Sequence, residues 1–296
     1  MQQLFITTCR IFSLFTIFIT LLTISGCQSV NTVNFLTPRS DFTLEKDLSY
    51  GDDPRQVLDV YTPLNIKPKQ SIIVFVHGGS WDSGSKDDYL FVGQAFAALG
   101  YVTVIPNYRL YPQVEFPAFV EDIALAVATL DQVLSAASCP DRQKIILAGH
   151  SAGGHIAAML AAAPDYLQQQ DSDVDLQAFI GMAAPYDLPL DHPLVIDKFT
   201  SVTNNLDANP INLATSDMPP MLLFHGKNDT TVFPHHTLRF TERLQKLGVE
   251  VESHLYPKAD HTELVGALSS NLRFLNPVYK DMSKYLRKNG LNQSCE

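Results

Sequence analysis

One serine of the chain lies in a setting that suits a nucleophile. Gly149-His150-Ser151-Ala152-Gly153 follows the apolar run 144–148 and precedes the alanine-rich run 154–160. A tight turn between a strand and a helix holds a serine hydroxyl away from the backbone, and such a turn requires small residues two positions to each side. The pattern therefore predicts that Ser151 is a nucleophile. The alternative interpretation is a glycine-rich turn without chemistry.

A serine hydroxyl needs a base within hydrogen-bond reach, and the base needs a carboxylate that fixes its tautomer. Asp229 follows the apolar run 221–224, and His261 follows the run that ends near Tyr256. We therefore assign Asp229 as the orienting acid and His261 as the base. His261 is expected to take the proton of Ser151 and to deliver it to the leaving group.

The chain carries nine histidines, and most are given other roles. His225 begins the loop of Asp229 and is predicted to support it by hydrogen bonding. The pair His235 and His236 is predicted to be solvated. Asp260 is adjacent to His261 but should point elsewhere, as a loop carboxylate. No cluster shows metal-ligand spacing, so neither a metal nor a cofactor is expected. The histidines given supporting or packing roles are His77, His150, His155 and His254.

The oxyanion that forms when a carbonyl is attacked needs preorganised N–H donors. The segment His77-Gly78-Gly79-Ser80-Trp81 follows the buried strand expected at 71–76, and its glycines let backbone amides turn inward. We assign the amides of Gly78, Gly79 and Ala152 as the donors. Trp81 is interpreted either as a wall of the substrate pocket or as an ordinary aromatic at its rim.

The elements around these residues alternate between strands and helices. This alternation predicts a mostly parallel sheet with helices on both faces, and ligands bind such sheets beyond the carboxyl ends of the strands. Each motif above follows a strand. Strands are expected at 57–61, 71–76, 101–106, 144–148, 176–182, 221–225 and 249–256, and helices at 91–99, 116–134, 154–160, 237–247 and 277–289.

Composition narrows the class of partner. The 296 residues carry a formal net charge of −10, and 46% of them are hydrophobic. This content is ample for a large core, while the acidic balance disfavours nucleic acid and anionic membrane surfaces as partners. A small molecule is the expected partner. The sequence leaves the oligomeric state unassigned.

The amino end, residues 1–26, resembles a bacterial lipoprotein signal peptide. An apolar run at 11–24 follows Arg10, and Ile24-Ser25-Gly26-Cys27 resembles the lipobox, which implies that Cys27 is lipidated and anchors the mature chain to a membrane. Gln28 then implies the outer membrane of the cell envelope. There are two alternatives for this segment. It is either an ordinary signal peptide that is cleaved on secretion or an uncleaved membrane anchor. Residues 27–45 are predicted to be a polar tether.

Two further cysteines, Cys139 and Cys295, lie far apart in the sequence. In an oxidising compartment they would form a disulfide, and otherwise they are unrelated thiols.

Together the motifs resemble the α/β-hydrolase superfamily, in particular carboxylesterases of the His-Gly-Gly type. The chain order Ser151, Asp229, His261 is that of this fold. Segments 107–110 and 116–122 resemble hormone-sensitive-lipase-like esterases, whereas 149–155 is similar to the feruloyl-esterase-like and kynurenine-formamidase-like branch. The sequence departs from the lipase-like branch at positions 80 and 150. The matching Arg109 and Asp122 are interpreted as a buried structural pair.

The resemblance implies one α/β-hydrolase domain at 46–296, with a lid at about 185–220, and a two-step reaction on carboxylic esters without a cofactor. Because this lid is short and rich in proline, we expect an open pocket and short to modest acyl groups. The alternatives are an arylformamidase, an esterase that removes acetyl or feruloyl groups from polysaccharide, and a hydrolase fold kept as a binding module. The last would be expected to lack a member of the triad.

Overall fold

The computed structural model describes residues 26–65, 71–134, 141–202, 204–289 and 291. The chain divides into two compact units, Met1–Leu36 and Thr37–Glu296. In the first, the described part is helix α2 (Gly26–Leu36), which contains Cys27. Among the described residues, no helix combines the length and apolar character that crossing a membrane requires. The predicted signal peptide, apart from Gly26, and the cysteines Cys139 and Cys295 lie outside the described residues.

The segment predicted as a tether contains more regular structure than expected. Besides α2, it includes the start of strand β1 (Phe42–Ser49), which pairs antiparallel with β2 (Val57–Pro63) from Phe42 onward. The tether prediction was therefore wrong at its carboxyl end. β1 is an edge strand that buries few side chains, so its charged residues obscured the strand pattern.

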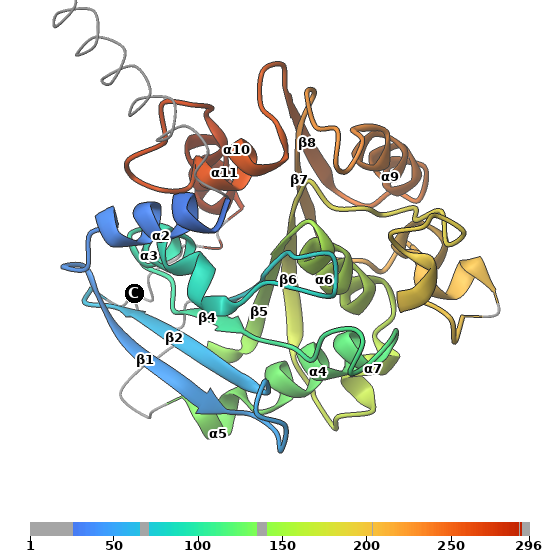
Figure 1. Cartoon of the computed structure of the whole chain (residues 1–296), viewed down its shortest axis with the longest axis horizontal. Coiled ribbons are helices and arrows are strands. Elements are labelled where there is room, and N and C mark those ends of the chain that lie inside the picture. The colour runs from blue at the N-terminus through green and yellow to red at the C-terminus, as the bar shows by residue number, and fades with distance from the viewer. Residues whose placement is uncertain (1–25, 66–70, 135–140, 203, 290, 292–296) are drawn as a thin grey trace, which may run out of the picture. The chain divides into compact units, whose positions relative to one another are not determined.

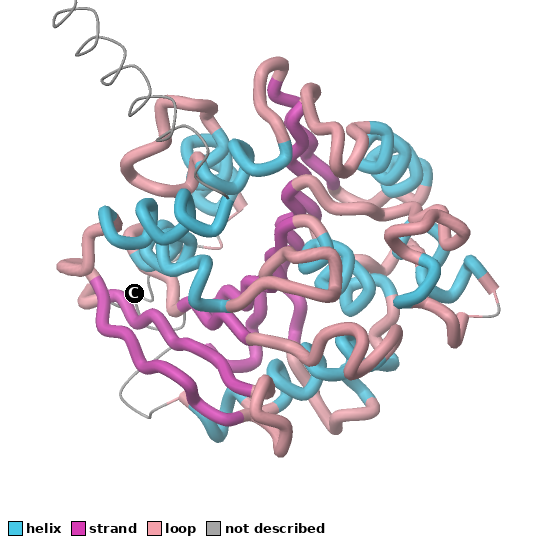
Figure 2. The backbone as a smooth tube through the Cα atoms, viewed as in Figure 1, coloured by secondary structure: helices cyan, strands magenta, loops and turns pink. Residues whose placement is uncertain are grey.

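The second unit is built on one sheet of eight strands in the order β1-β2-β4-β3-β5-β6-β7-β8 (Figures 1 and 2). β1, β2 and β4 pair antiparallel, and every pair from β4 to β8 is parallel. The prediction of a mostly parallel sheet is confirmed. The remaining strands are β3 (Ser71–Val76), β4 (Thr103–Pro106), β5 (Asp141–His150), β6 (Asp175–Met182), β7 (Met221–Gly226) and β8 (Val251–Tyr256).

Helices cover both faces of this sheet. In Figure 1, α4, α6 and α9 lie on one side of it, and α3, α10 and α11 lie on the other. Strands β3 and β7 are consequently buried along their whole length, which explains why their sequences are continuous apolar runs. The helices of this unit are α3 (Leu90–Ala97), α4 (Ala118–Ala128), α5 (Leu130–Val133), α6 (Ala152–Ala162), α7 (Asp165–Gln168), α8 (Pro210–Leu213), α9 (His235–Lys246), α10 (His261–Gly266) and α11 (Val278–Lys288).

Two helices differ from expectation. The helix predicted at 116–134 divides into α4 and α5 at Thr129, whose hydroxyl donates to the carbonyls of Leu125 and Ala126 and so competes with the helical pattern. The short helix α10 was not predicted. It begins at His261, and this start places the imidazole directly beyond the carboxyl end of β8.

Candidate active site

Ser151 joins β5 to α6 in a strained backbone conformation, with φ 54° and ψ −127°. The neighbouring glycines are required because chain segments approach closely here. A Cβ at Gly153 would lie 2.2 Å from the carbonyl oxygens of both Val76 and His77, and one at Gly149 would lie 2.5 Å from the Gly153 oxygen. The prediction of a strand–turn–helix around Ser151 is confirmed, and strain of this kind is typical of functional sites.

The structure brings together the three residues that the sequence assigned to nucleophilic chemistry. Ser151 Oγ lies 2.9 Å from His261 Nε2, and His261 Nδ1 lies 2.7 Å from Asp229 Oδ2. Because the carboxylate can only accept, Nδ1 carries the proton and Nε2 is left as the acceptor for the serine hydroxyl. This arrangement can withdraw a proton from Ser151.

The carboxylate of Asp229 is only 2% exposed, yet it is well supplied with donors. Its Oδ1 accepts the N–H groups of Thr231 and Val232, both at 2.9 Å. Burial raises the pKa of Asp229, but the hydrogen bonds from His225 and His261 outweigh burial and hold this pKa well below its usual range. The side chain is therefore ionised at neutral pH.

His225 supports the loop of Asp229, as the sequence predicted. Its Nε2 lies 2.8 Å from the Val232 carbonyl, and its Nδ1 lies 2.7 Å from Thr237 Oγ1. The carbonyl fixes the proton on Nε2, so Nδ1 accepts from the threonine. The buried ring thereby holds the loop between β7 and α9 in shape.

Two other carboxylates have structural roles. Asp260 caps helix α10, since its Oδ1 accepts the N–H groups of Thr262 and Glu263. Asp122 is buried and forms an ion pair of 2.6 Å with Arg109. Both interpretations from the sequence are confirmed.

The loop after β3 requires one correction. The N–H of Gly78 donates to Tyr89 Oη at 3.2 Å and is therefore not free for a substrate oxygen, so its assignment as an oxyanion donor was wrong. Gly79 and Ser80 have φ values of 127° and 51°, and their amides donate to no backbone carbonyl of the described residues. Ala152 is the first residue of α6, where an N–H has no partner within the helix.

The amide of Ser80, which was not among the donors assigned from the sequence, is a further candidate donor. The available signal was its position, directly after the two glycines, where the lipase-like esterases have a third glycine.

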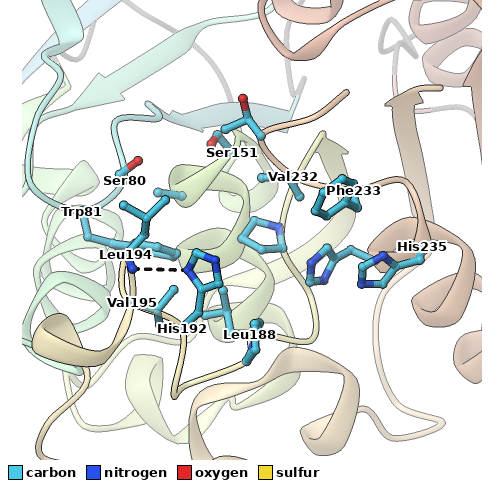
Figure 3. A pocket seen from close by; sticks show the side chains of 15 residues that line it. Ser80, Trp81, Ser151, Leu188, His192, Leu194, Val195, Val232, Phe233 and His235 are labelled. Atoms are coloured by element: carbon cyan, nitrogen blue, oxygen red, sulfur yellow. Dashed lines mark hydrogen bonds between the residues drawn. The ribbon is translucent and has the colours of Figure 1, made fainter. Parts of the chain in front are cut away.

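A pocket of about 180 Å³ opens beside Ser151 (Figure 3). Trp81 lines it and is only 5% exposed, with its ring edge-on to those of His155 and Phe199 at 5.4 and 5.2 Å. Trp81 is therefore a wall of the pocket rather than a rim residue. The other lining residues are Ser80, Ala152, Pro185, Leu188, Pro189, His192, Leu194, Val195, Thr231, Val232, Phe233, His235 and His236.

The histidine pair at the start of α9 differs from expectation. The rings of His235 and His236 stack at 4.4 Å, and His236 is buried rather than solvated. Burial lowers the pKa of His236 to about 3, so this ring is neutral. The error arose because two adjacent polar residues at a helix start carry no sign of the pocket that both of them line.

The segment at 185–220 forms much of the pocket wall and is tied to the loop after β3. Lys198 Nζ lies 2.6 Å from Asp82 Oδ2 and donates to the Leu194 carbonyl at 3.0 Å. The next residue, Phe199, packs against Trp81. Two consecutive residues of the segment thus hold two consecutive residues of the loop.

Among the described residues, no group of three or more histidine, cysteine, aspartate or glutamate side chains is arranged to hold a metal ion.

The sequence is similar to a known family of proteins and to several esterases. The model of the BD-FAE family matches residues 58–244. Isoprenylcysteine alpha-carbonyl methylesterase ICME of Arabidopsis thaliana is 30% identical over 75% of this chain and 57% of its own length. Esterase LipC of Mycobacterium tuberculosis is 30% identical over 81% of this chain and 66% of its own length. The chain thus spans between half and two thirds of these relatives.

Among solved structures, the apo form of Thermogutta terrifontis esterase 2 superimposes with a TM-score of 0.70 at 25% identity, over 86% of this chain and 97% of that one. A carbohydrate esterase from gut microbiota gives a TM-score of 0.73 at 18% identity, over 86% and 99% of the two chains, and shows the shared fold. The α/β-hydrolase fold that the sequence resemblance implied is confirmed.

Proposed function

The chain belongs to the BD-FAE family, and we propose that it is a serine carboxylesterase that hydrolyses short to modest carboxylic esters through an acyl-enzyme. The observation that carries this proposal is the hydrogen-bonded series from Ser151 through His261 to Asp229, at 2.9 and 2.7 Å. The esterases among its relatives support the same chemistry.

In the first step, Ser151 Oγ attacks the ester carbonyl while His261 Nε2 takes its proton. The imidazolium that forms is stabilised by the ionised Asp229. The ester C–O bond then breaks, the alcohol leaves with the proton from His261, and the acyl group remains on Ser151.

In the second step, water attacks the acyl-enzyme with His261 again as the base. The C–O bond to Ser151 breaks, the serine regains its proton, and the carboxylic acid is released. In both steps the negative oxygen is received by the amides of Ala152 and Gly79, which remain from the predicted set once Gly78 is removed, and by the amide of Ser80.

The dimensions of the pocket support a small substrate group. A volume of about 180 Å³ with a largely apolar wall, including Trp81, Leu188 and Val195, suits a short acyl chain better than a long one.

The test is hydrolysis of nitrophenyl esters of increasing acyl length by the purified chain without residues 1–27. We expect acetate and butyrate to be cleaved and Ser151→Ala to reduce the rate by at least ~10³-fold. A fluorophosphonate probe should label the wild type at Ser151. Retained hydrolysis in Ser151→Ala would contradict the proposal. Formylkynurenine in the same panel tests the arylformamidase alternative, and acetylated or feruloylated polysaccharide tests the other enzymatic alternative.

We further propose that Cys27 carries a lipid anchor in a bacterial cell envelope, on the strength of the lipobox resemblance at 24–27. Expression in a bacterial host with radiolabelled palmitate should label the wild type but not Cys27→Ser. Equal labelling of the two proteins would exclude this cysteine as the attachment site.

A further inference from the structure

His150 lies between the loop after β3, which holds the proposed oxyanion donors, and the loop after β8, which leads to His261. It is the residue directly before Ser151, and it is only 5% exposed. Its ring centroid is 4.7 Å from that of His261, and a Cβ at Gly78 would lie 3.1 Å from its Nδ1. A single side chain therefore contacts both the base and the loop of the oxyanion donors.

The ring takes part in two of the three hydrogen bonds of one continuous series. The Gly78 N–H donates to Tyr89 Oη at 3.2 Å, Tyr89 Oη lies 3.4 Å from His150 Nδ1, and His150 Nε2 lies 3.1 Å from the carbonyl oxygen of His261. The series begins in the loop after β3 and ends on the backbone of the catalytic base.

The direction of every bond in this series is fixed by its two ends. An amide N–H can only donate, and a carbonyl oxygen can only accept. Burial and the neighbouring His261 lower the pKa of His150 to about 3, so the ring is neutral and carries one proton, which the His261 carbonyl holds on Nε2. Nδ1 must then accept from the Tyr89 hydroxyl, which in turn accepts from Gly78.

All three bonds therefore point the same way, and bonds aligned in this manner polarise and strengthen one another. The pKa of Tyr89 is raised by burial to about 12, so its hydroxyl keeps the proton that the series requires.

We propose that Tyr89 and His150 are positioning residues, and that the series Gly78–Tyr89–His150–His261 fixes the oxyanion loop and the catalytic base at a set separation on either side of Ser151. This inference rests on the proposed function. Neither Tyr89 nor His150 lines the pocket, so neither is expected to contribute to binding of the ground-state substrate. The series acts through the oxyanion loop and the base His261, which must both be in position when the tetrahedral intermediate forms.

The test uses two conservative variants. Tyr89→Phe removes only the hydroxyl, and His150→Gln keeps a donor for the His261 carbonyl while removing the acceptor for Tyr89. For nitrophenyl butyrate we expect each to lower kcat about five- to tenfold with KM within about twofold, the pattern of an interaction realised in the transition state. Because both break the same link, the double variant should lose far less than the product of the two effects.

Tyr186→Phe is the matched control, because Tyr186 Oη is also buried but has no hydrogen-bond partner among the described residues. Its kcat should equal that of the wild type. A kcat of Tyr89→Phe within twofold of the wild type, or losses that multiply in the double variant, would overturn the proposal, whatever the change in Tm.

The rate of fluorophosphonate labelling at Ser151 provides a second readout that does not depend on the choice of ester. We expect Tyr89→Phe to be labelled several times more slowly than Tyr186→Phe. If the wild type is labelled but hydrolyses no ester of the panel, the proposed function fails while the positioning role is still measured. Equal labelling rates of the two variants would refute the positioning role alone.

Discussion

Replacing Asp229 by asparagine should reverse the tautomer of the base. Asp229 Oδ1 accepts two N–H groups, from Thr231 and Val232, at 2.9 Å each. An asparagine that turned its NH₂ group toward them would leave donors facing donors, at a cost of about 1–3 kcal/mol for each unsatisfied group. The amide oxygen therefore stays on this side, and the NH₂ group faces His261 Nδ1.

Nδ1 must then accept, so the proton moves to Nε2 and faces Ser151, where a lone pair is needed. A triad with the wrong tautomer loses on the order of 10⁴ in kcat, about 5.4 kcal/mol at 1.36 kcal/mol per tenfold. The assay is steady-state hydrolysis of nitrophenyl butyrate at neutral pH by Asp229→Asn, with folding checked by Tm.

The matched control is Asp260→Asn, because Asp260 also accepts two backbone N–H groups but caps α10 rather than contacting the imidazole. Asparagine is a comparable helix cap, so this variant should retain kcat within about twofold. If Asp229→Asn kept more than about a tenth of the wild-type kcat, the tautomer argument would fail, because a tautomer effect is far larger than tenfold.

Three further outcomes follow from packing and burial. In the folded protein, burial lowers the pKa of His155 to about 4, whereas in the unfolded chain its imidazole titrates near pH ~6.5. Between these two pH values, the imidazole binds a proton only when the chain is unfolded. The free energy of unfolding, measured in urea, should therefore fall as the pH is lowered from ~6.5 to ~4, and it should fall less steeply in His155→Gln. Equal slopes of the free energy against pH in the two proteins would contradict this prediction. Gly153→Ala places a Cβ 2.2 Å from two carbonyl oxygens and should cost about 3 kcal/mol or more, seen as a lower Tm, whereas Gly266→Ala, with its nearest atom at 3.8 Å, should not lower Tm. Lys198→Met leaves Asp82 without its ion pair and should lower kcat a few-fold, with recovery in Lys198→Arg; an unchanged kcat would show that this pair does not steady the oxyanion loop.

The triad could be predicted from sequence because each member follows a strand. In a parallel sheet, carboxyl ends share one edge, so Ser151, Asp229 and His261 needed no distance information to be assigned together. The strands themselves were recognisable because burial on both faces demands continuous apolar runs.

The oxyanion donors were harder to predict, because two glycines in a row indicate that amides can turn inward without saying which amide is already occupied. That depends on Tyr89, which is eleven residues from Gly78 and carries no motif. The burial of His236 was missed for the same reason, since the pocket is formed by the segment at 185–220 together with the start of α9. Contacts between distant segments decide these details, and a local pattern does not record them.

The attachment of Lys198 and Phe199 to Asp82 and Trp81 has a consequence for engineering. The segment that shapes the pocket beside Ser151 also holds the loop whose amides we propose as oxyanion donors. Replacing this segment with the equivalent segment of another esterase would therefore change both the substrate selectivity and the turnover rate of this protein. Variants that retain the lysine and phenylalanine anchors while altering Leu188 or Leu194 offer a route to new acyl preferences at undiminished speed.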